Sequence, residues 1–228
     1  KAYNFNTKIL ILPLFISDLF FKKKIFKKTF RKKVHLNKNY FNILFIGRLN
    51  FKKGLDLLIP AFKKIKNKFP NTKLIIVGPN NDQYYENFLI PLINKDKLKN
   101  DVIYHKPIYN NELINCYKDA NLFVLPSYSE NFGLTIFEAM SQKVPVIVSD
   151  QVDMVKDIKH NNIARVCKCN IDSIFKNIEF VIKNKKSTKS LVKRAFRFVN
   201  KNLTSNYIEN KFTKNYIDIL KIHKKINL

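Results

Sequence analysis

Short apolar runs alternate with longer segments of helical period between Asn42 and Cys167, and this alternation constrains the fold more than any other feature of the sequence. Six runs predict buried strands, at residues 42–47, 73–78, 102–105, 122–126, 144–149 and 164–167. Helical periodicity predicts helices at residues 55–69, 84–97 with a break near Pro91, 111–120 and 134–142. Apolar strands separated by helices form parallel sheets that are covered on both faces. The sequence therefore predicts an α/β fold with a doubly wound, Rossmann-like parallel sheet.

The segments on either side of this region are less regular. Residues 7–13 predict a further strand, and residues 171–228 have a helical composition with a break expected near 185–189. The most apolar stretch, residues 9–21, is interrupted by a proline and an aspartate and is shorter than the roughly 18 to 20 residues of a membrane span. A chain of 228 residues forms one large domain or two small ones.

The chain carries a large excess of positive charge, because 43 Lys and Arg stand against 17 Asp and Glu, giving a formal net charge of +26. A polyanionic partner is one explanation. Compositional drift is the other, since Lys, Asn, Ile and Phe are abundant and basic residues are dispersed over most segments. The densest basic run, at 20–33, either contacts anionic lipid headgroups or is a solvated linker. No nucleic-acid-binding module is apparent, so no specific nucleic acid partner is expected.

The four glycines stand where the predicted strands end. Gly47 and Gly78 close the first two strands, Gly54 opens the first helix, and Gly133 lies in the turn that follows the strand at 122–126. Open α/β sheets bind ligands at the carboxyl ends of their strands, where glycine allows the backbone to approach closely. Ordinary turn glycines would also occur at the opposite edge, and none does. The glycines therefore predict a ligand site at the carboxyl edge.

Basic side chains follow the first of these strand ends. Arg48 comes directly after Gly47, and Lys52 and Lys53 precede Gly54. The planar guanidinium and the compact ammonium together suit a diphosphate. In a chain with 43 basic residues this is a weak signal by itself, and its position at the sheet edge gives it weight.

The segment 127–140 adds two carboxylates and a helix N-terminus. Phe132 to Thr135 form the first turn of a predicted helix, whose free N–H groups attract an anion. Glu130 precedes this turn and Glu138 lies a turn further on. Taken singly, Glu138 is an acid favoured by the helix dipole and Glu130 an exposed loop acid. Carboxylates also accept hydrogen bonds from sugar hydroxyls, so together with the cations they predict a nucleotide-sugar pocket.

These motifs resemble those of one protein family. The chain is similar to the C-terminal, donor-binding domain of the family-four retaining glycosyltransferases of GT-B fold, through the motifs Gly47-Arg48-Leu49, Lys53-Gly54, Pro126-Ser127, Glu130-Asn131-Phe132-Gly133-Leu134 and Glu138-Ala139-Met140. The seven residues between the two glutamates match the paired-glutamate signature of that family. The similarity runs from about Lys8 to the C-terminus. It implies one half of a GT-B architecture with additional C-terminal helices.

The resemblance also implies roles for single residues. Arg48 and Lys53 would neutralise the donor diphosphate and Glu130 would contact the donor sugar near its reacting carbon, so these three form the implied catalytic set. The implied donor-binding set holds the sugar hydroxyls, the phosphates and, through Glu138, the ribose hydroxyls: Gly47, Asn131, Phe132, Gly133, Leu134, Thr135 and Glu138. No metal and no cofactor is implied, because two cations and a helix N-terminus can stabilise the leaving nucleotide diphosphate. In this family a donor phosphate oxygen is thought to help deprotonate the acceptor, so Glu130 need not be a nucleophile.

Two positions depart from the family pattern. The turn after Met140 usually contains a small residue and a glycine, whereas this chain has Ser141-Gln142-Lys143, and Lys143 fits without strain only if its φ is negative. Lys106-Pro107 stands where a glycine usually closes the strand at 102–105, in the loop that flanks the nucleobase. No base-contact residue is therefore assigned.

The resemblance divides the chain into three parts. Residues 1–40 correspond to a remnant of the N-terminal half and the interdomain linker, residues 41–185 to the nucleotide-sugar donor domain, and residues 186–228 to C-terminal helices that pack back across the cleft. The acceptor domain of a GT-B enzyme has no counterpart in the sequence. The sequence is then a fragment, the product of a degraded gene, or one half of an enzyme whose other half is a separate polypeptide.

The expected function is transfer of a hexose-type sugar from a nucleotide diphosphate sugar to a glycan or lipid-linked acceptor, as in polysaccharide biosynthesis. The alternative is a non-catalytic nucleotide-sugar-binding module, or a relic without an acceptor domain. Three cysteines without a framework spacing argue against an oxidising compartment. A cytoplasmic location is expected, and peripheral membrane contact through the run at 20–33 is compatible with it.

Overall fold

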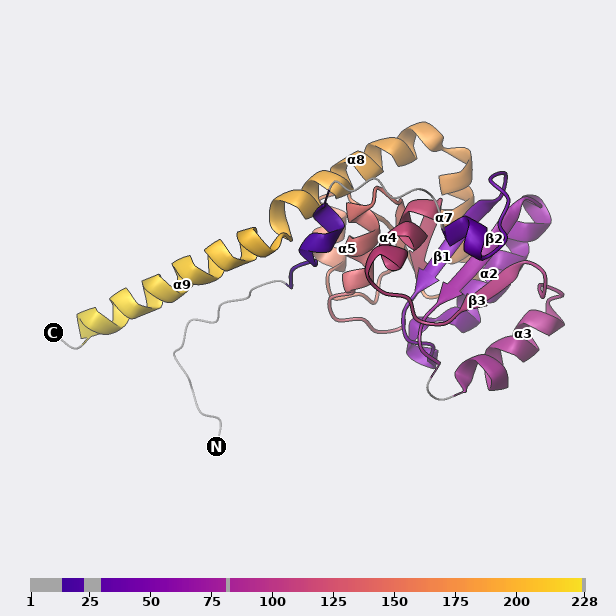
Figure 1. Cartoon of the computed structure of the whole chain (residues 1–228), viewed down its shortest axis with the longest axis horizontal. Coiled ribbons are helices and arrows are strands. Elements are labelled where there is room, and N and C mark those ends of the chain that lie inside the picture. Colours follow the sequence, from indigo (N-terminus) through magenta and orange to yellow (C-terminus); the bar gives the residue numbers. More distant parts are fainter. Residues whose placement is uncertain (1–13, 23–29, 81–82, 227–228) are drawn as a thin grey trace.

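The computed structural model describes residues 14–22, 30–80 and 83–226. Within these residues, six parallel strands form one sheet in the order β3-β2-β1-β4-β5-β6 (Figure 1). They are β1 (Phe41–Ile46), β2 (Thr72–Val77), β3 (Val102–His105), β4 (Leu122–Leu125), β5 (Val146–Ser149) and β6 (Arg165–Cys167). The chain winds outward in both directions from the central pair β1 and β4, where the strand order reverses. This arrangement confirms the doubly wound, Rossmann-like fold and places a topological switch point between β1 and β4.

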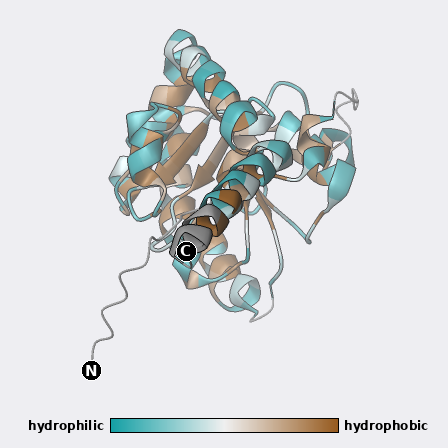
Figure 2. Cartoon of the chain, turned by 90° about the vertical axis from the view of Figure 1, so that its left-hand side faces the viewer, coloured by the Kyte–Doolittle hydropathy of each residue, from teal (hydrophilic) through white to brown (hydrophobic). Residues whose placement is uncertain are grey.

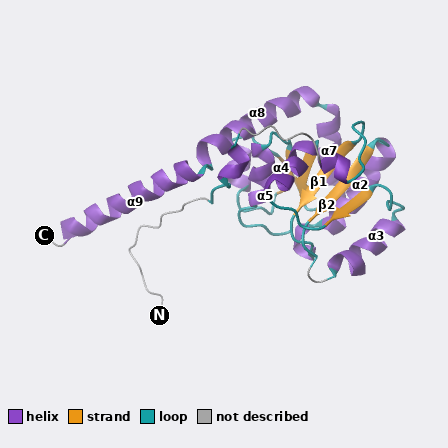
Figure 3. Ribbon diagram, viewed as in Figure 1, coloured by secondary structure: helices purple, strands orange, loops and turns teal. Residues whose placement is uncertain are grey.

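Helices cover both faces of the sheet (Figure 3). On one face, α2 (Leu55–Lys68) packs against α3 (Ile90–Lys95) and α7 (Ile171–Lys183). On the other face, α5 (Leu134–Ser141) packs against α8 (Lys185–Asn202), and α4 (Asn110–Asp119) packs against α1 (Phe30–Lys33). The remaining elements are η1 (Asp18–Phe21), η2 (Phe51–Lys53), η3 (Tyr85–Leu89), α6 (Val155–His160) and α9 (Ser205–Ile226).

The six predicted strands from residue 42 onward are confirmed, with ends shifted by at most two residues; the four inner strands are apolar runs buried on both sides, and the edge strands β3 and β6 are only partly buried. The strand expected at 7–13 lies outside the described residues. In the helix expected at 84–97 the chain stays helical through Pro91, but the hydrogen-bond pattern changes directly before it, from the π-helical turn η3 to α3. The C-terminal break falls at Asn184, one residue before the expected range, and a second break at Leu203–Thr204 separates α8 from α9.

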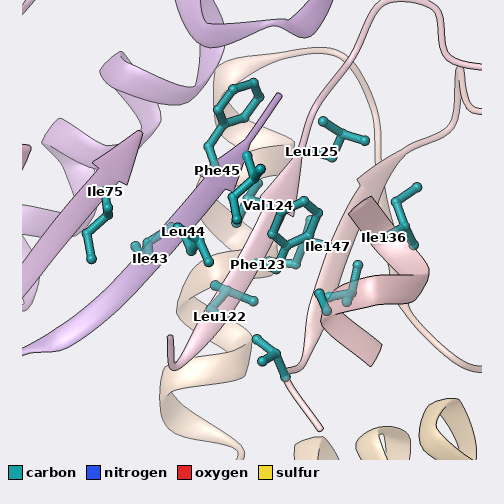
Figure 4. Packing of buried hydrophobic residues seen from close by; sticks show 14 of the residues in the cluster. Ile43, Leu44, Phe45, Ile75, Leu122, Phe123, Val124, Leu125, Ile136 and Ile147 are labelled. Atoms are coloured by element: carbon teal, nitrogen blue, oxygen red, sulfur yellow. The ribbon is translucent and has the colours of Figure 1, made fainter. Parts of the chain in front are cut away.

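The core lies where the sheet meets the two helix layers. Ile43, Leu44 and Phe45 of β1 and Phe123 of β4 are completely buried (Figure 4). The strands carry hydrophobic colours along their length in Figure 2. Both central strands are apolar at consecutive positions because helices cover both sides of the sheet.

The described residues that precede β1 belong to this core. Ile16, Phe20 and Phe30 are buried. The backbone N–H of Arg31 donates to the carboxylate of Asp119 at the end of α4, at 2.8 Å. The segment is therefore packed against the other-face helices α4 and α5.

The two C-terminal helices differ in how much of their surface is buried. Leu191, Ala195 and Val199 bury one side of α8, whereas α9 extends away from the sheet (Figure 1) and leaves Phe212 and Tyr216 more than half exposed. The expected cleft lies between the donor domain and an acceptor domain that this chain does not include. Packing of the C-terminal helices across that cleft therefore stays a prediction. None of the helices in the described part of the chain is long and apolar enough to cross a membrane.

Candidate functional site

Glycines bring three strand-end loops into direct contact at the carboxyl edge of the sheet. A Cβ atom on Gly78, after β2, would lie 1.9 Å from the carbonyl oxygen of Gly47, after β1. A Cβ atom on Gly54 would lie 2.2 Å from the carbonyl oxygen of Pro126, after β4, and Gly54 has φ +69°. No side chain fits at either position. These glycines place the loops on either side of the switch point against each other, as the sequence predicts.

The loop between β1 and α2 is fastened to the loop after β4 at several points. The backbone N–H of Tyr128 donates to the carbonyl oxygen of Lys52 at 2.8 Å, and its ring stacks on Phe51 with centroids 5.1 Å apart. The Tyr128 hydroxyl donates to the carboxylate of Asp56, in the first turn of α2, at 2.7 Å. Burial and this hydrogen bond raise the pKa of Tyr128. The three contacts fix the position of Lys53, which lies between Lys52 and α2.

Lys53 forms an ion pair with Glu130 across this junction. The Lys53 Nζ lies 2.5 Å from Glu130 Oε2, and both side chains are only about one-fifth exposed, at 21% and 18%. The Glu130 backbone is held by the loop after β5, because its N–H donates to the Gln151 carbonyl at 3.3 Å and its carbonyl accepts from the Asp153 N–H at 2.9 Å. Glu130 is therefore not the exposed loop acid of the plainer interpretation. The structure places one predicted cation and one predicted carboxylate in direct contact, on backbones fixed from both sides.

Arg48 lies on the same loop, but its side chain has no hydrogen-bond or ion-pair partner among the described residues. The side chain is also exposed. All five guanidinium N–H groups are therefore available to an anion at this edge. Gly47, directly before it, contacts Gly78, so the arginine starts from a fixed backbone.

The N-terminus of α5 follows Glu130 directly. Gly133 has φ +71° and precedes α5, and a Cβ atom there would lie 2.6 Å from Cδ1 of Ile136. Phe132 packs against Phe137 with ring centroids 5.0 Å apart, and Asn131 is exposed. Among the remaining predicted residues of this turn, Leu134 is exposed and Thr135 half-buried. The Ile136 N–H donates to the Gly133 carbonyl at 2.9 Å, whereas the N–H groups of Leu134 and Thr135 make no hydrogen bond with a described residue, and the helix end supplies partial positive charge beside Glu130.

Glu138 lies further along α5, beyond its first turn, so it is not the dipole-favoured acid of the plainer interpretation. Its Oε2 accepts a hydrogen bond from the hydroxyl of Tyr117 on α4 at 2.8 Å. Burial raises the pKa of Glu138, and the bond from Tyr117 partly opposes that rise. Tyr117 itself is fully buried. One carboxylate oxygen is thus held by the protein and the other has no hydrogen bond with a described residue.

The turn after α5 keeps the conformation that glycine would favour, although it contains none. Lys143 has φ +61°, so the condition for a strain-free fit is not met. Its ammonium lies 4.7 Å from the ring centroid of Phe196 on α8, a contact that partly compensates. The second departure, Lys106-Pro107, follows His105, whose ring packs edge-on against Phe30 with centroids 5.5 Å apart.

Sequence reasoning missed the residues that support this edge. Tyr117 and Asp56 each hold a site residue by a side-chain hydrogen bond, and Gln151 and Asp153 hold the backbone of Glu130. Tyr128, in the loop that holds Glu130, links this loop to the loop between β1 and α2 through its contacts with Lys52 and Asp56. The one sequence signal that could have found Asp56 is its position as an acidic residue in the first turn of the helix that follows the loop cations.

The carboxyl edge of the Rossmann-like sheet thus brings together two cations, a helix N-terminus and two partly buried carboxylates. Residues 26–198 match the sequence profile of Glycosyl transferases group 1, so the chain belongs to this family. An uncharacterized glycosyltransferase of Methanocaldococcus jannaschii is 31% identical over 181 residues, which cover 79% of this chain and 44% of that protein. Mannosylfructose-phosphate synthase of Agrobacterium fabrum is 34% identical over 47% of this chain and 25% of its own length.

Solved structures of GT-B glycosyltransferases share the fold. A glycosyltransferase from Rickettsia africae matches with a TM-score of 0.81 and 21% identity, over 92% of this chain and 56% of that one. The Anabaena protein HepE, solved in complex with UDP-glucose, matches with a TM-score of 0.76 and 19% identity, over 84% of this chain and 52% of its own. The chain thus spans about half, or less, of the length of these relatives.

Proposed function

We propose that this chain is the donor-binding half of a retaining glycosyltransferase that transfers a hexose-type sugar from a nucleotide diphosphate sugar to a glycan or lipid-linked acceptor, without a metal ion. The observation that carries the proposal is the contact between Lys53 and Glu130 beside the N-terminus of α5. This contact supports the proposal because an ammonium suited to phosphate and a carboxylate suited to sugar hydroxyls lie side by side. The group 1 family and the UDP-glucose complex of HepE support the same donor class.

Each of these residues is proposed to bind a different part of the donor. The ammonium of Lys53 has three N–H donors, so it can keep Glu130 and bind a phosphate oxygen at the same time. Arg48 provides a second cation for the diphosphate, one that has no ion pair with a described residue, and the first turn of α5 provides N–H groups. The free oxygen of Glu138 accepts from a ribose hydroxyl while Tyr117 holds its other oxygen.

In the proposed reaction, the bond between the anomeric carbon and the diphosphate oxygen breaks as the acceptor oxygen bonds to that carbon on the same face. The acceptor proton passes to a phosphate oxygen of the leaving nucleotide diphosphate. Lys53 and Arg48 stabilise the charge that develops on the diphosphate, which is the task of a metal ion in other transferases. Glu130 orients the sugar and needs no covalent bond to it.

Thermal unfolding of the chain with UDP, GDP and ADP tests the donor site. We expect one nucleotide to raise the melting temperature equally in EDTA and in magnesium, because binding to the folded state stabilises it. Glu138→Gln should remove most of the shift, whereas Glu209→Gln, on α9, should leave it unchanged. No shift with any nucleotide would contradict the proposal and favour a module that has lost its ligand.

A further inference from the structure

A basic cavity lies at the edge of the sheet opposite the carboxyl-edge site. It has a volume of about 100 Å³ and reaches from the amino ends of β5 and β6 to the first turns of α8. Its lining includes Arg165, Arg194, Asn162, Phe180 and Thr188. Because Pro145 and Val146 also line it, at the start of β5, it shares no residue with the carboxyl-edge site.

The two arginines lack a counter-charge. Neither Arg165 nor Arg194 forms an ion pair with a carboxylate in the described ranges. Arg165 is partly buried against Phe180, with its guanidinium carbon 3.8 Å from the ring centroid. Two cations in one partly enclosed cavity repel each other, and an anion between them would remove that cost.

Neutral partners hold both guanidinium groups in place and leave donors free. Arg165 Nε donates to Asn177 Oδ1 at 2.8 Å, and Arg194 donates from Nε to the Asn162 carbonyl at 2.8 Å and from Nη1 to Ser190 Oγ at 2.9 Å. Both Nη atoms of Arg165 and Nη2 of Arg194 make no hydrogen bond with a described residue. Planar guanidinium groups fixed in this way match the oxygens of a phosphate.

A buried hydroxyl in the same lining also lacks a partner. Thr188 Oγ1 is buried and makes no hydrogen bond with any residue that the structure describes. A buried, unpaired hydroxyl costs free energy, and an oxyanion in the cavity would accept its hydrogen. This observation is independent of charge and points to a polar occupant.

We propose that this cavity binds a phosphoryl group, either as orthophosphate or at the end of a small phosphomonoester. Ser187 lines both the cavity and a shallow, open surface hollow, which Lys183, Lys185, Lys186 and Ser190 also line. The phosphoryl group occupies the small cavity and the body of an ester lies in this hollow. The site is distinct from the donor pocket and does not depend on the proposed transferase function.

Calorimetric titration of the chain with orthophosphate tests this site, carried out on the Arg48→Gln background so that phosphate binding at the donor edge is weakened. We expect Arg194→Gln to weaken phosphate binding by about tenfold or more, since it removes a charge-assisted hydrogen bond. The matched control is Arg197→Gln, which removes the same charge three residues further along α8 but does not line the cavity. It should change the affinity by less than about twofold.

Two further variants separate binding from folding. Arg194→Lys keeps the charge and loses the planar fork, so phosphate binding should be intermediate. Thr188→Val keeps the shape and should weaken phosphate binding without lowering the melting temperature of the free chain. Equal losses in Arg194→Gln and Arg197→Gln, or no saturable binding up to about 10 mM phosphate, would overturn the proposal.

Glucose 6-phosphate distinguishes the two sources of the phosphoryl group. If orthophosphate binds more tightly than the ester, the free ion is the ligand. If the ester binds more tightly and Lys186→Gln removes the difference, the ligand is a phosphomonoester whose body lies in the neighbouring hollow. An ester affinity that is insensitive to Arg194→Gln would contradict the site for both sources.

Discussion

At the scale of single residues, Lys143 shows what the scarcity of glycine costs. It adopts φ +61° in the turn after α5, where a side chain costs about 1–2 kcal/mol. We predict that Lys143→Gly will be more stable than Lys143→Ala by about 1 kcal/mol, because both lose the contact with Phe196 and only glycine relieves the strain. Urea unfolding measures the difference. Equal stabilities would show that the turn is not strained.

Gly54 is the residue on which the junction of the two loops depends. We predict that Gly54→Ala will lower the free energy of unfolding by about 3 kcal/mol or more, because its Cβ would meet the Pro126 carbonyl at 2.2 Å and φ is +69°. Gly47→Ala is the matched control, since a Cβ there meets only the ring of Phe45 at an ordinary 3.4 Å. If Gly54→Ala were as stable as Gly47→Ala, the close approach of Gly54 to the Pro126 carbonyl would be contradicted. Chemical unfolding of both variants decides.

Glu138 makes stability depend on pH. Burial raises its pKa above the ordinary 4.5, so the folded state binds the proton more strongly than the unfolded state. The contribution of Glu138 to stability is therefore fully present below the unfolded pKa and is lost as pH rises through the folded pKa. We predict that the unfolding free energy of the wild type, relative to that of Glu138→Gln, will fall as the pH rises from 4 to 8. A difference that is constant with pH would contradict the raised pKa.

At the scale of elements, the carboxyl edge depends on the joining of the β1–α2 and β4–α5 loops. We predict that Tyr128→Phe will lower the free energy of unfolding by about 1–3 kcal/mol, since Asp56 loses the hydroxyl at 2.7 Å and its other oxygen is already without a partner in the described structure. Nucleotide affinity should fall with it. Tyr109→Phe is the control, because Tyr109 is 70% exposed. Loss of stability without any loss of nucleotide affinity would mean that the loop does not position Lys53.

Much of this edge could be predicted because the signals are local. Strands that are apolar throughout fixed the positions of the strand ends, and the glycines next to them marked the loops that must approach closely. The structure brings Arg48, Lys53, Glu130, Gly133 and Glu138 to that edge. Their roles toward a donor stay predictions.

The supporting contacts could not be predicted, since they join residues far apart in the chain. Tyr117 and Glu138 are 21 residues apart, and Tyr128 and Asp56 are 72 apart. One sequence contains no pairing information for such contacts. The break at Leu203–Thr204 was missed because no proline or glycine marks it.

At the scale of the whole molecule, the two proposed anion sites account for only part of the charge of +26. Arg48 and Lys53 serve the carboxyl edge, and Arg165 and Arg194 line the cavity at the amino edge. Many of the remaining lysines are exposed, as compositional drift predicts. The sheet thus separates the two proposed anion sites, one with carboxylates that also suit sugar hydroxyls and one lined by two arginines.

The most direct test of the donor site compares the affinities of a nucleoside diphosphate and the matching monophosphate by calorimetry in EDTA. We predict that the nucleotide identified by the thermal shift will bind at least about tenfold more tightly as the diphosphate, because Arg48 and Lys53 hold the second phosphate. Arg48→Gln and Lys53→Gln should each reduce that ratio, whereas Arg197→Gln should not. A ratio near one, or a ratio that both site variants leave unchanged, would contradict a diphosphate site at the carboxyl edge.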